Sequence, residues 1–244
     1  MAILEICVES AAGLEAARAG GADRAELCSA LGLGGLTPSP GLIALAARQP
    51  LPCHAMIRPR AGGFAYSVAE VAQMESDIAA IAAAGLAGVV FGATRDGALD
   101  RELLARLLAH TAAVGEAAGR RLSTTLHRAI DTLADPVAAT DVAAALGFDR
   151  VLTSGGAPTA IAGRETLRAM REHAGDAIGV MAGSGIDADN VGGLLALGLG
   201  EIHASCSVGI PEDDRALAHL GFSHPRSATD VERVRALRRA LDHR

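Results

Sequence analysis

Apolar and polar positions along this chain follow two patterns, which alternate from one end of the chain to the other. Short apolar runs are typical of buried strands, and the Ala- and Leu-rich stretches between them repeat their apolar positions at steps of three and four, as helices do. The predicted strands cover residues 3–8, 23–28, 53–58, 87–92, 122–127, 149–154, 177–182 and 201–206. The predicted helices cover residues 10–19, 38–48, 69–84, 100–118, 135–146, 164–173, 187–197 and 228–242.

Eight strands that are each followed by a helix, in a chain of 244 residues, predict an α/β fold, a single-domain (β/α)8 TIM barrel. Ser10, Asp135 and Asp187 are the predicted N-caps, and Pro136 suits the first position of its helix. No linker or change of composition divides the chain. We therefore predict one domain over residues 1–244, in which the C-terminal tail (207–244) contributes the last helix.

A weak internal repeat supports the barrel. The turns AGGADRAEL, AGLAGVVFG, LGFDRVLTS and LGLGEIHAS introduce every second strand, and their glycines suit the left-handed conformation that ends a helix. This spacing indicates a two-strand unit used four times. The main alternative is a doubly wound open sheet, which usually has a Gly-rich first turn. Here the first strand is followed by VESAAG, so we favour the barrel and expect no nucleotide cofactor.

The composition limits which cellular compartment and which classes of partner we expect. No apolar run reaches the roughly 18 residues of a membrane span, and the start MAILEICVES lacks the basic region of a signal peptide. We therefore expect a cytoplasmic protein with no membrane partner. A net charge of −6 argues against nucleic acid as a partner. The basic residues are all arginines, which excludes Schiff-base chemistry through a lysine.

Side chains alternate between the two faces of a strand, so one face of each barrel strand packs on helices and the other fills the interior. In the first strand, Leu4, Ile6 and Val8 are assigned to the helices, which leaves Glu5, Cys7 and Glu9 inside. The same parity places a mainly polar set inside the barrel from the other strands: Glu26, Cys28, His54, Met56, Arg58, Ser123, Thr125, His127, Gly179, Met181, Glu201, His203 and Ser205.

Buried charges survive when they are paired, so we predict that Arg58 pairs with Glu5, Glu26 or both. One interpretation is a buried ionic network that only fills the barrel. The other is a functional site, because the polar residues gather toward the carboxyl ends of the strands, where barrel enzymes and binding proteins place their sites.

The sequence resembles the CutC family of copper homeostasis proteins over nearly all of its length up to about residue 206. The stretches that carry the resemblance are LEICVES, GGADRAELCSALGLGGLTPSPGLI, MIRPRAGGFAYS, GVVFGATRDGALD, LHRAIDTLADP, LGFDRVLTSGG, VMAGSGIDADNV and EIHASC. The resemblance implies a TIM barrel, a cytoplasmic location, a role in copper tolerance, Cu(I) as a ligand and a homodimer.

Soft sulfur ligands suit Cu(I). Cys7 and Cys28 have the same inward parity on neighbouring strands, and Met56 follows on the third, so these three are the predicted metal ligands. Cys28 matches the family's ELC position and is the ligand that the resemblance favours. Cys53 points toward the helices by parity, and buried sulfur is also an ordinary core filler.

A second set of residues suits a small anion. Arg58 and Arg60 offer guanidinium groups, and Gly-rich turns follow three strands at one rim of the barrel. The predicted ligand-binding residues are Arg60, Ser154, Gly155, Gly183, Gly185 and Ser205. The aromatic residues Phe64 and Tyr66 lie in a long loop that we expect to form a lid or a subunit contact.

A third set suits acid–base chemistry. The predicted catalytic residues are Glu5, Glu26, Arg58, His127, Asp131 and His203. Two functions therefore stay open. One is a copper homeostasis protein that binds Cu(I). The other is a barrel enzyme, similar to lyases, aldolases or isomerases, that acts on a small phosphorylated or carboxylated metabolite.

Overall fold

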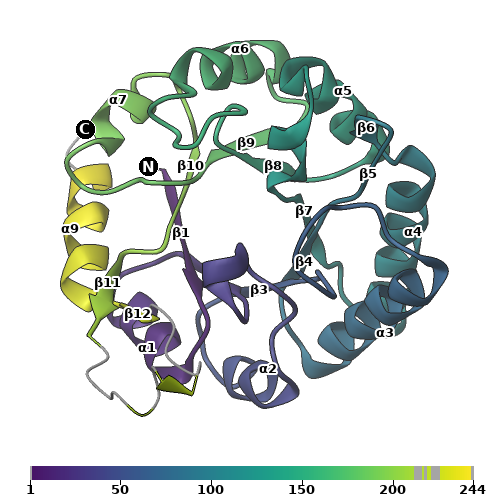
Figure 1. Ribbon diagram of the computed structural model, residues 1–244, viewed down its shortest axis with the longest axis horizontal. Coiled ribbons are helices and arrows are strands. Elements are labelled where there is room, and N and C mark those ends of the chain that lie inside the picture. The colour runs from purple at the N-terminus through teal and green to yellow at the C-terminus, as the bar shows by residue number, and fades with distance from the viewer. Residues whose placement is uncertain (1, 212–215, 217–218, 221–225, 243–244) are drawn as a thin grey trace.

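The computed structural model describes residues 2–211, 216, 219–220 and 226–242. Its centre is a closed barrel of eight parallel strands with helices around the outside, as Figure 1 shows. The strands are β1 (Ile3–Val8), β2 (Arg24–Leu27), β3 (Cys53–Met56), β4 (Gly88–Phe91), β7 (Ser123–Leu126), β8 (Arg150–Thr153), β9 (Gly179–Ala182) and β10 (Glu201–Ala204). They pair in chain order, and β1 closes the ring on β10. The predicted fold class is confirmed, although most strands are shorter than the apolar runs.

Helices connect the strands on the outer face of the barrel. They are α1 (Ala11–Gly20), α2 (Pro40–Ala46), α3 (Val68–Ala84), α4 (Arg101–Ala117), α5 (Pro136–Leu146), α6 (Arg164–Ala174), α7 (Val191–Leu195) and α9 (Val231–Asp242), with 3₁₀ turns η1 (Leu31–Leu33) and η2 (Arg128–Thr132). No described helix is long and apolar enough to cross a membrane. Two small antiparallel hairpins, absent from the sequence-based prediction, are β5 (Thr94–Arg95) with β6 (Ala98–Leu99) and β11 (Ser207–Ile210) with β12 (Arg226–Thr229).

The local signals explain most of the helix boundaries. Ser10 accepts a hydrogen bond from the Gly13 amide, and Asp135 caps α5 ahead of Pro136. The predicted cap at Asp187 is placed differently. Its carboxylate accepts the Asp189 and Asn190 amides in a turn that precedes the helix, and α7 begins only at Val191.

Three of the four repeated turns end a helix, at the C-caps Gly21, Gly85 and Gly147, and the fourth lies just after α7. Gly21, Gly85, Gly147 and Gly198 all have positive φ angles between 74° and 93°, which a residue with a side chain rarely adopts. Each of these turns leads into a barrel strand that starts a few residues later. The four turns thus set where the second, fourth, sixth and eighth barrel strands enter the sheet.

The main apolar core lies between the barrel and its helices. It includes Leu4, Ile6 and Val8 of β1, as the parity predicts, and it also includes Cys53. The last helix, α9, packs on α1 at Gly20, where a Cβ atom would lie 2.4 Å from Val234. The prediction of a single domain over 1–244, with a tail from 207, includes residues outside the described ones. The described end of that tail, α9, belongs to the barrel's outer layer.

Candidate functional site

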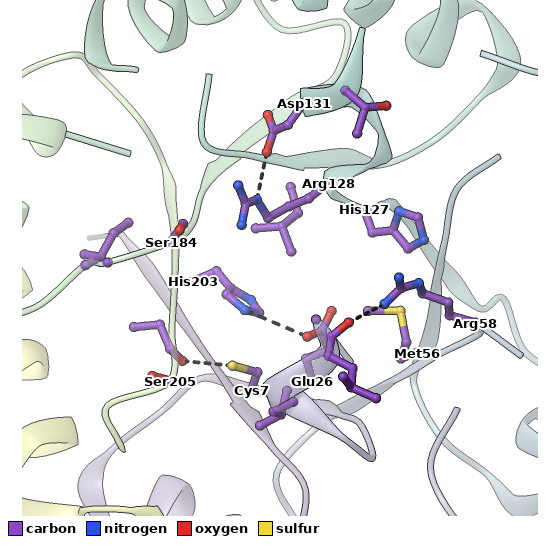
Figure 2. A pocket seen from close by; sticks show the side chains of 18 of the residues that line it. Cys7, Glu26, Met56, Arg58, His127, Arg128, Asp131, Ser184, His203 and Ser205 are labelled. Atoms are coloured by element: carbon purple, nitrogen blue, oxygen red, sulfur yellow. Dashed lines mark hydrogen bonds and ion pairs between the residues drawn. The ribbon is translucent and has the colours of Figure 1, made fainter. Parts of the chain in front are cut away.

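A cavity of about 510 Å³ opens at the carboxyl ends of the barrel strands. Its walls come from segments far apart in the chain (Figure 2). Of the predicted site residues, those that line it are Cys7, Glu26, Met56, Arg58, His127, Asp131, Gly185, His203 and Ser205. Those that do not line it are Glu5, Cys28, Arg60, Ser154, Gly155 and Gly183.

Below the cavity, toward the amino ends of the strands, charged side chains fill the barrel in a layer that we call the lower ionic layer: Glu5, Arg24, Arg150 and Glu201. Arg24 donates to Glu5 and, over 2.6 Å, to Glu201. Arg150 pairs with Glu201 at 3.1 Å and donates to the hydroxyl groups of β7. Sequence reasoning missed Arg24 as the partner of Glu5, although Arg24 has the same parity as Glu26.

The predicted pairing of Arg58 with Glu5 or Glu26 is wrong. β3 ends at Met56, so Arg58 lies in the loop that follows and not inside the ring of strands. Its guanidinium donates to the carbonyl oxygens of Leu33, Gly35 and Gly62 at 2.8–3.1 Å. It also lies over the Phe64 ring, with its central carbon 5.2 Å from the ring centroid. No carboxylate among the described residues forms an ion pair with it.

Cys7, Glu26 and His203 bring one sulfur, one oxygen and one nitrogen donor within 4.8 Å of one another, and all three residues are buried. Nδ1 of His203 hydrogen-bonds to Glu5 over 2.8 Å, and its Nε2 lies 3.8 Å from Glu26. A carboxylate on the far nitrogen of a histidine orients the ring, as it does in metal sites. This arrangement offers a metal ion three donors, one of which is already oriented.

The two buried glutamates beside His203 have opposite pKa shifts. Burial raises the pKa of Glu5, but the hydrogen bond with His203 and the charge of Arg24 outweigh it, so this pKa falls well below its ordinary value. Burial dominates at Glu26 and raises its pKa. The pKa of His203 is raised well above its usual range, because the nearby Cys7, Glu26 and Glu5 overcome its burial. Glu26 is thus the carboxyl group that most readily holds a proton.

Cys28 lies outside the cavity. It is fully buried in a small apolar cluster with Met56 and Val90, and a Cβ atom at Gly35 would lie 3.1 Å from its sulfur. Its thiol donates to Glu26 over 3.4 Å, and burial raises its pKa well above the ordinary value. A thiol that keeps its proton is a poor metal ligand. The structure therefore separates Cys28 from Cys7, which faces the cavity.

His127 and Asp131 are fixed by local hydrogen bonds. Nδ1 of His127 accepts the Ala129 amide, and burial lowers its pKa to about 3, so the ring is neutral. Its Nε2 is buried without a hydrogen-bond partner. Asp131 accepts from Arg128 and from the Ser154 and Gly156 amides. Since these donors occupy both oxygens of Asp131, this residue holds the loop after β8 and is poorly placed to act as a base.

The predicted anion site is only partly assembled. Gly185 and Ser205 line the cavity, whereas the Ser154 amide is taken by Asp131 and the Gly155 amide by Thr153. Arg60 pairs with Glu70 outside the cavity and lies over Tyr66. Because β3 ends at Met56, the alternation of side chains along that strand does not extend to Arg60. The amide of Gly183 continues the sheet by donating to the carbonyl of Thr153.

Comparison with known proteins gives consistent results along the chain. The family model described as the CutC family matches residues 2–208. A CutC family protein of Sinorhizobium medicae is 50% identical over 243 residues, which are 98% of this chain and 96% of that protein. A CutC family protein of Caulobacter vibrioides is 46% identical over 245 residues, which cover 97% of each chain.

Solved structures agree with the fold. The crystal structure of a CutC protein from Streptococcus agalactiae, provisionally named for copper homeostasis, matches with a TM-score of 0.76 at 29% identity and covers 84% of this chain and 99% of that one. A 2,3-dimethylmalate lyase matches with a TM-score of 0.56 at 15% identity over 84% of this chain and 76% of that one, which shows a shared fold alone.

Proposed function

The chain belongs to the CutC family, and from this premise we propose that it is a copper homeostasis protein that binds Cu(I) at the mouth of its barrel. The observation that carries the proposal is the convergence of Cys7, Glu26 and His203 within 4.8 Å. These residues come from three neighbouring strands, β1, β2 and β10, so the barrel itself sets their spacing. A cytoplasmic location and a homodimer belong to the same proposal and rest on the family resemblance.

The chemistry of the donors supports a metal of soft or borderline character. A thiolate and an imidazole nitrogen suit copper and zinc, and a carboxylate adds a harder third donor. The thioether of Met56 lines the same cavity and is a further soft group. Glu26 leaves Oε1 buried without a hydrogen-bond partner, as expected of a ligand atom awaiting an ion. Metal binding would displace the protons whose binding is favoured at Glu26 and His203, because a ligand atom must be deprotonated to bind a metal.

A Cu(I) titration of the reduced protein against a competing chelator tests the proposal. Replacement Cys7→Ser should weaken Cu(I) binding by about 100-fold or more, since even the loss of an outer partner costs up to that much. Cys53→Ser is the matched control, because Cys53 is buried on the helix side of β3 and should leave the affinity unchanged. Equal affinities for the two variants, or displacement of Cu(I) by equimolar Zn²⁺, would contradict a Cu(I) site here.

A second candidate function is catalysis on a small phosphorylated or carboxylated metabolite. One observation favours it: the cavity of about 510 Å³ is far larger than one ion needs and lies in the range of small-molecule sites. Glu26, with its raised pKa, could supply a proton, and the neutral His127 lies on another wall. A thermal-shift screen of such metabolites tests this candidate, because a ligand raises the melting temperature according to its affinity.

A further inference from the structure

The loop after β3 leaves one buried positive charge without a negative partner. Arg58 is 6% exposed and lines the cavity, yet its hydrogen bonds go to carbonyl oxygens of neutral peptide groups. Within the described part of the chain, Arg24 and Arg150 are balanced by Glu5 and Glu201, and Arg128 by Asp131. A buried charge without a counter-ion is costly. A single negative charge inside the cavity would offset it.

Arg128 offers a preoriented contact for such a charge. It follows β7, and its guanidinium lies at the cavity wall near Asp131 (Figure 2). Nε donates to Asp131 and Nη2 to Ser154, both over 2.8 Å, which fixes the plane of the group. No hydrogen bond among the described residues uses Nη1, and 42% of the side chain stays exposed. A fixed planar guanidinium with a free N–H is suited to a carboxylate.

The loop after β9 supplies further donors on the cavity wall. Ser184, Gly185 and Ile186 line the cavity, and none of their three amides donates to another group in the described chain. Ser184 and Gly185 have φ angles of 84° and 68°, and the Ser184 hydroxyl holds the turn by donating to Pro158. Backbone amides that are not otherwise used can add hydrogen bonds to an anion.

The rest of the wall is apolar. Leu31, Leu33, Phe64, Leu152 and Ile186 all border the cavity. Leu33 is an exposed large apolar side chain, 58% accessible, and it belongs to the 3₁₀ turn at the mouth. Small-molecule sites combine apolar walls of this kind with a few placed polar groups. An inorganic ion would leave these surfaces uncovered, whereas an organic molecule would bury them.

We propose that the cavity binds a small organic carboxylate, whose carboxyl group pairs with Arg128 and whose apolar part lies against Leu33, Phe64 and Ile186. The apolar wall favours such a molecule over inorganic phosphate, which would leave Leu33, Phe64 and Ile186 uncovered. This inference rests on the second candidate function, that the cavity receives an organic molecule, and it does not require a metal ion.

The test uses calorimetry on the full-length, chelator-treated protein with acetate, butyrate and inorganic phosphate as probes. Butyrate should bind more tightly than acetate, which has less apolar surface, and more tightly than phosphate. Arg128→Gln should weaken that binding at least about tenfold, the effect of one lost charge-assisted hydrogen bond. Arg121→Gln is the matched control, because Arg121 pairs with Asp149 at the other end of β7. It should change the affinity less than about twofold.

Three results would overturn the inference: no binding of any carboxylate to the unaltered protein, tighter binding of phosphate, or equal affinities for the two variants. If Arg128→Gln does not fold, the Nε–H signal of Arg128 in the unaltered protein decides, since it should move on addition of butyrate. A Cu(I) titration of the same protein separates the two proposals. If the protein binds the carboxylate but does not bind Cu(I), only the proposed copper site is contradicted.

Discussion

The barrel interior contains two buried polar regions that differ in how completely their groups are paired. In the lower ionic layer, each arginine and each glutamate has at least two partners, as Arg24 does with Glu5 and Glu201. Toward the carboxyl ends of the barrel strands, Glu26, His127 and Arg58 each keep one buried polar atom without a hydrogen-bond partner, whereas beside the lower ionic layer His54 alone does, at Nδ1. Native interiors seldom leave such atoms unpaired. The comparison indicates that the lower region stabilises the fold and that the upper region is arranged for something outside the chain.

The same difference is seen between Glu5 and Glu26, which are residues of one type on adjacent strands. Both are buried, yet Glu5 is held as a carboxylate by Arg24 and His203, whereas burial raises the pKa of Glu26. The lower glutamate is therefore part of a closed set of ion pairs. The raised pKa of the upper one favours its protonated form, and its Oε1 has no hydrogen-bond partner.

The largest effect is expected from breaking the lower ionic layer. Arg24→Met removes the charge that Glu5 and Glu201 share, and the loss of one partner from a buried pair typically costs 3–5 kcal/mol. We expect a loss of about that size in the free energy of unfolding, measured in urea. Arg106→Met is the control, because its pair with Glu75 is on the surface, and it should have little effect. A loss below about 1 kcal/mol for Arg24→Met would refute the role of this layer.

A second prediction compares the two glutamates directly. Glu5→Gln should destabilise the protein by about 3 kcal/mol, because it weakens charge-assisted hydrogen bonds with Arg24 and His203. Glu26→Gln should change stability by less than about 1 kcal/mol, since its pKa is already raised and its Oε1 has no partner. The same variant should weaken Cu(I) binding. Equal destabilisation by the two changes would show that the regions do not differ as inferred.

A smaller effect should appear as a dependence of stability on pH. Burial lowers the pKa of both His54 and His127 to about 3, whereas an unfolded histidine titrates near 6.5. Below about pH 6.5 the unfolded state therefore binds protons that the folded state does not, and stability falls as the pH falls. Each histidine should contribute about 1.4 kcal/mol per pH unit between roughly pH 6 and 5.

Urea unfolding at these two pH values checks the sign and the slope. His54→Gln and His127→Gln should each reduce the slope. His203 is not expected to add to the slope in this window. Its pKa is raised, so it is charged in both states there and its stabilising effect is lost only at higher pH. A slope that persists in the double variant of His54 and His127 would contradict the assignment.

Much of the architecture could be predicted from periodicity, because the strands are buried and the helices are amphipathic. All eight barrel strands were placed correctly, and the inward parity of Glu5, Cys7 and His203 was right. The pairing of charges was not predictable in the same way. Parity assigns a side chain to a face but not to a height along the barrel, and the offset between neighbouring strands decides which charges meet.

Arg58 and Cys28 illustrate that limit. Arg58 continues the alternation of β3, but the strand ends two residues earlier and the loop turns its guanidinium toward peptide carbonyls. Cys28 has inward parity, but Gly35 and the loop above it cover its sulfur. Both outcomes depend on loops folding back over the strand ends, which the pattern of a single segment does not reveal.

The lower ionic layer also determines how a ligand can enter and leave the cavity. Because two arginines and two glutamates fill the lumen beneath the cavity, the described residues leave no passage through the barrel. Whatever enters must leave past the same rim, over Leu33 and Phe64. A ligand would then bind and be released past the same loops, so a substitution in these rim loops should alter both the association and the dissociation rate.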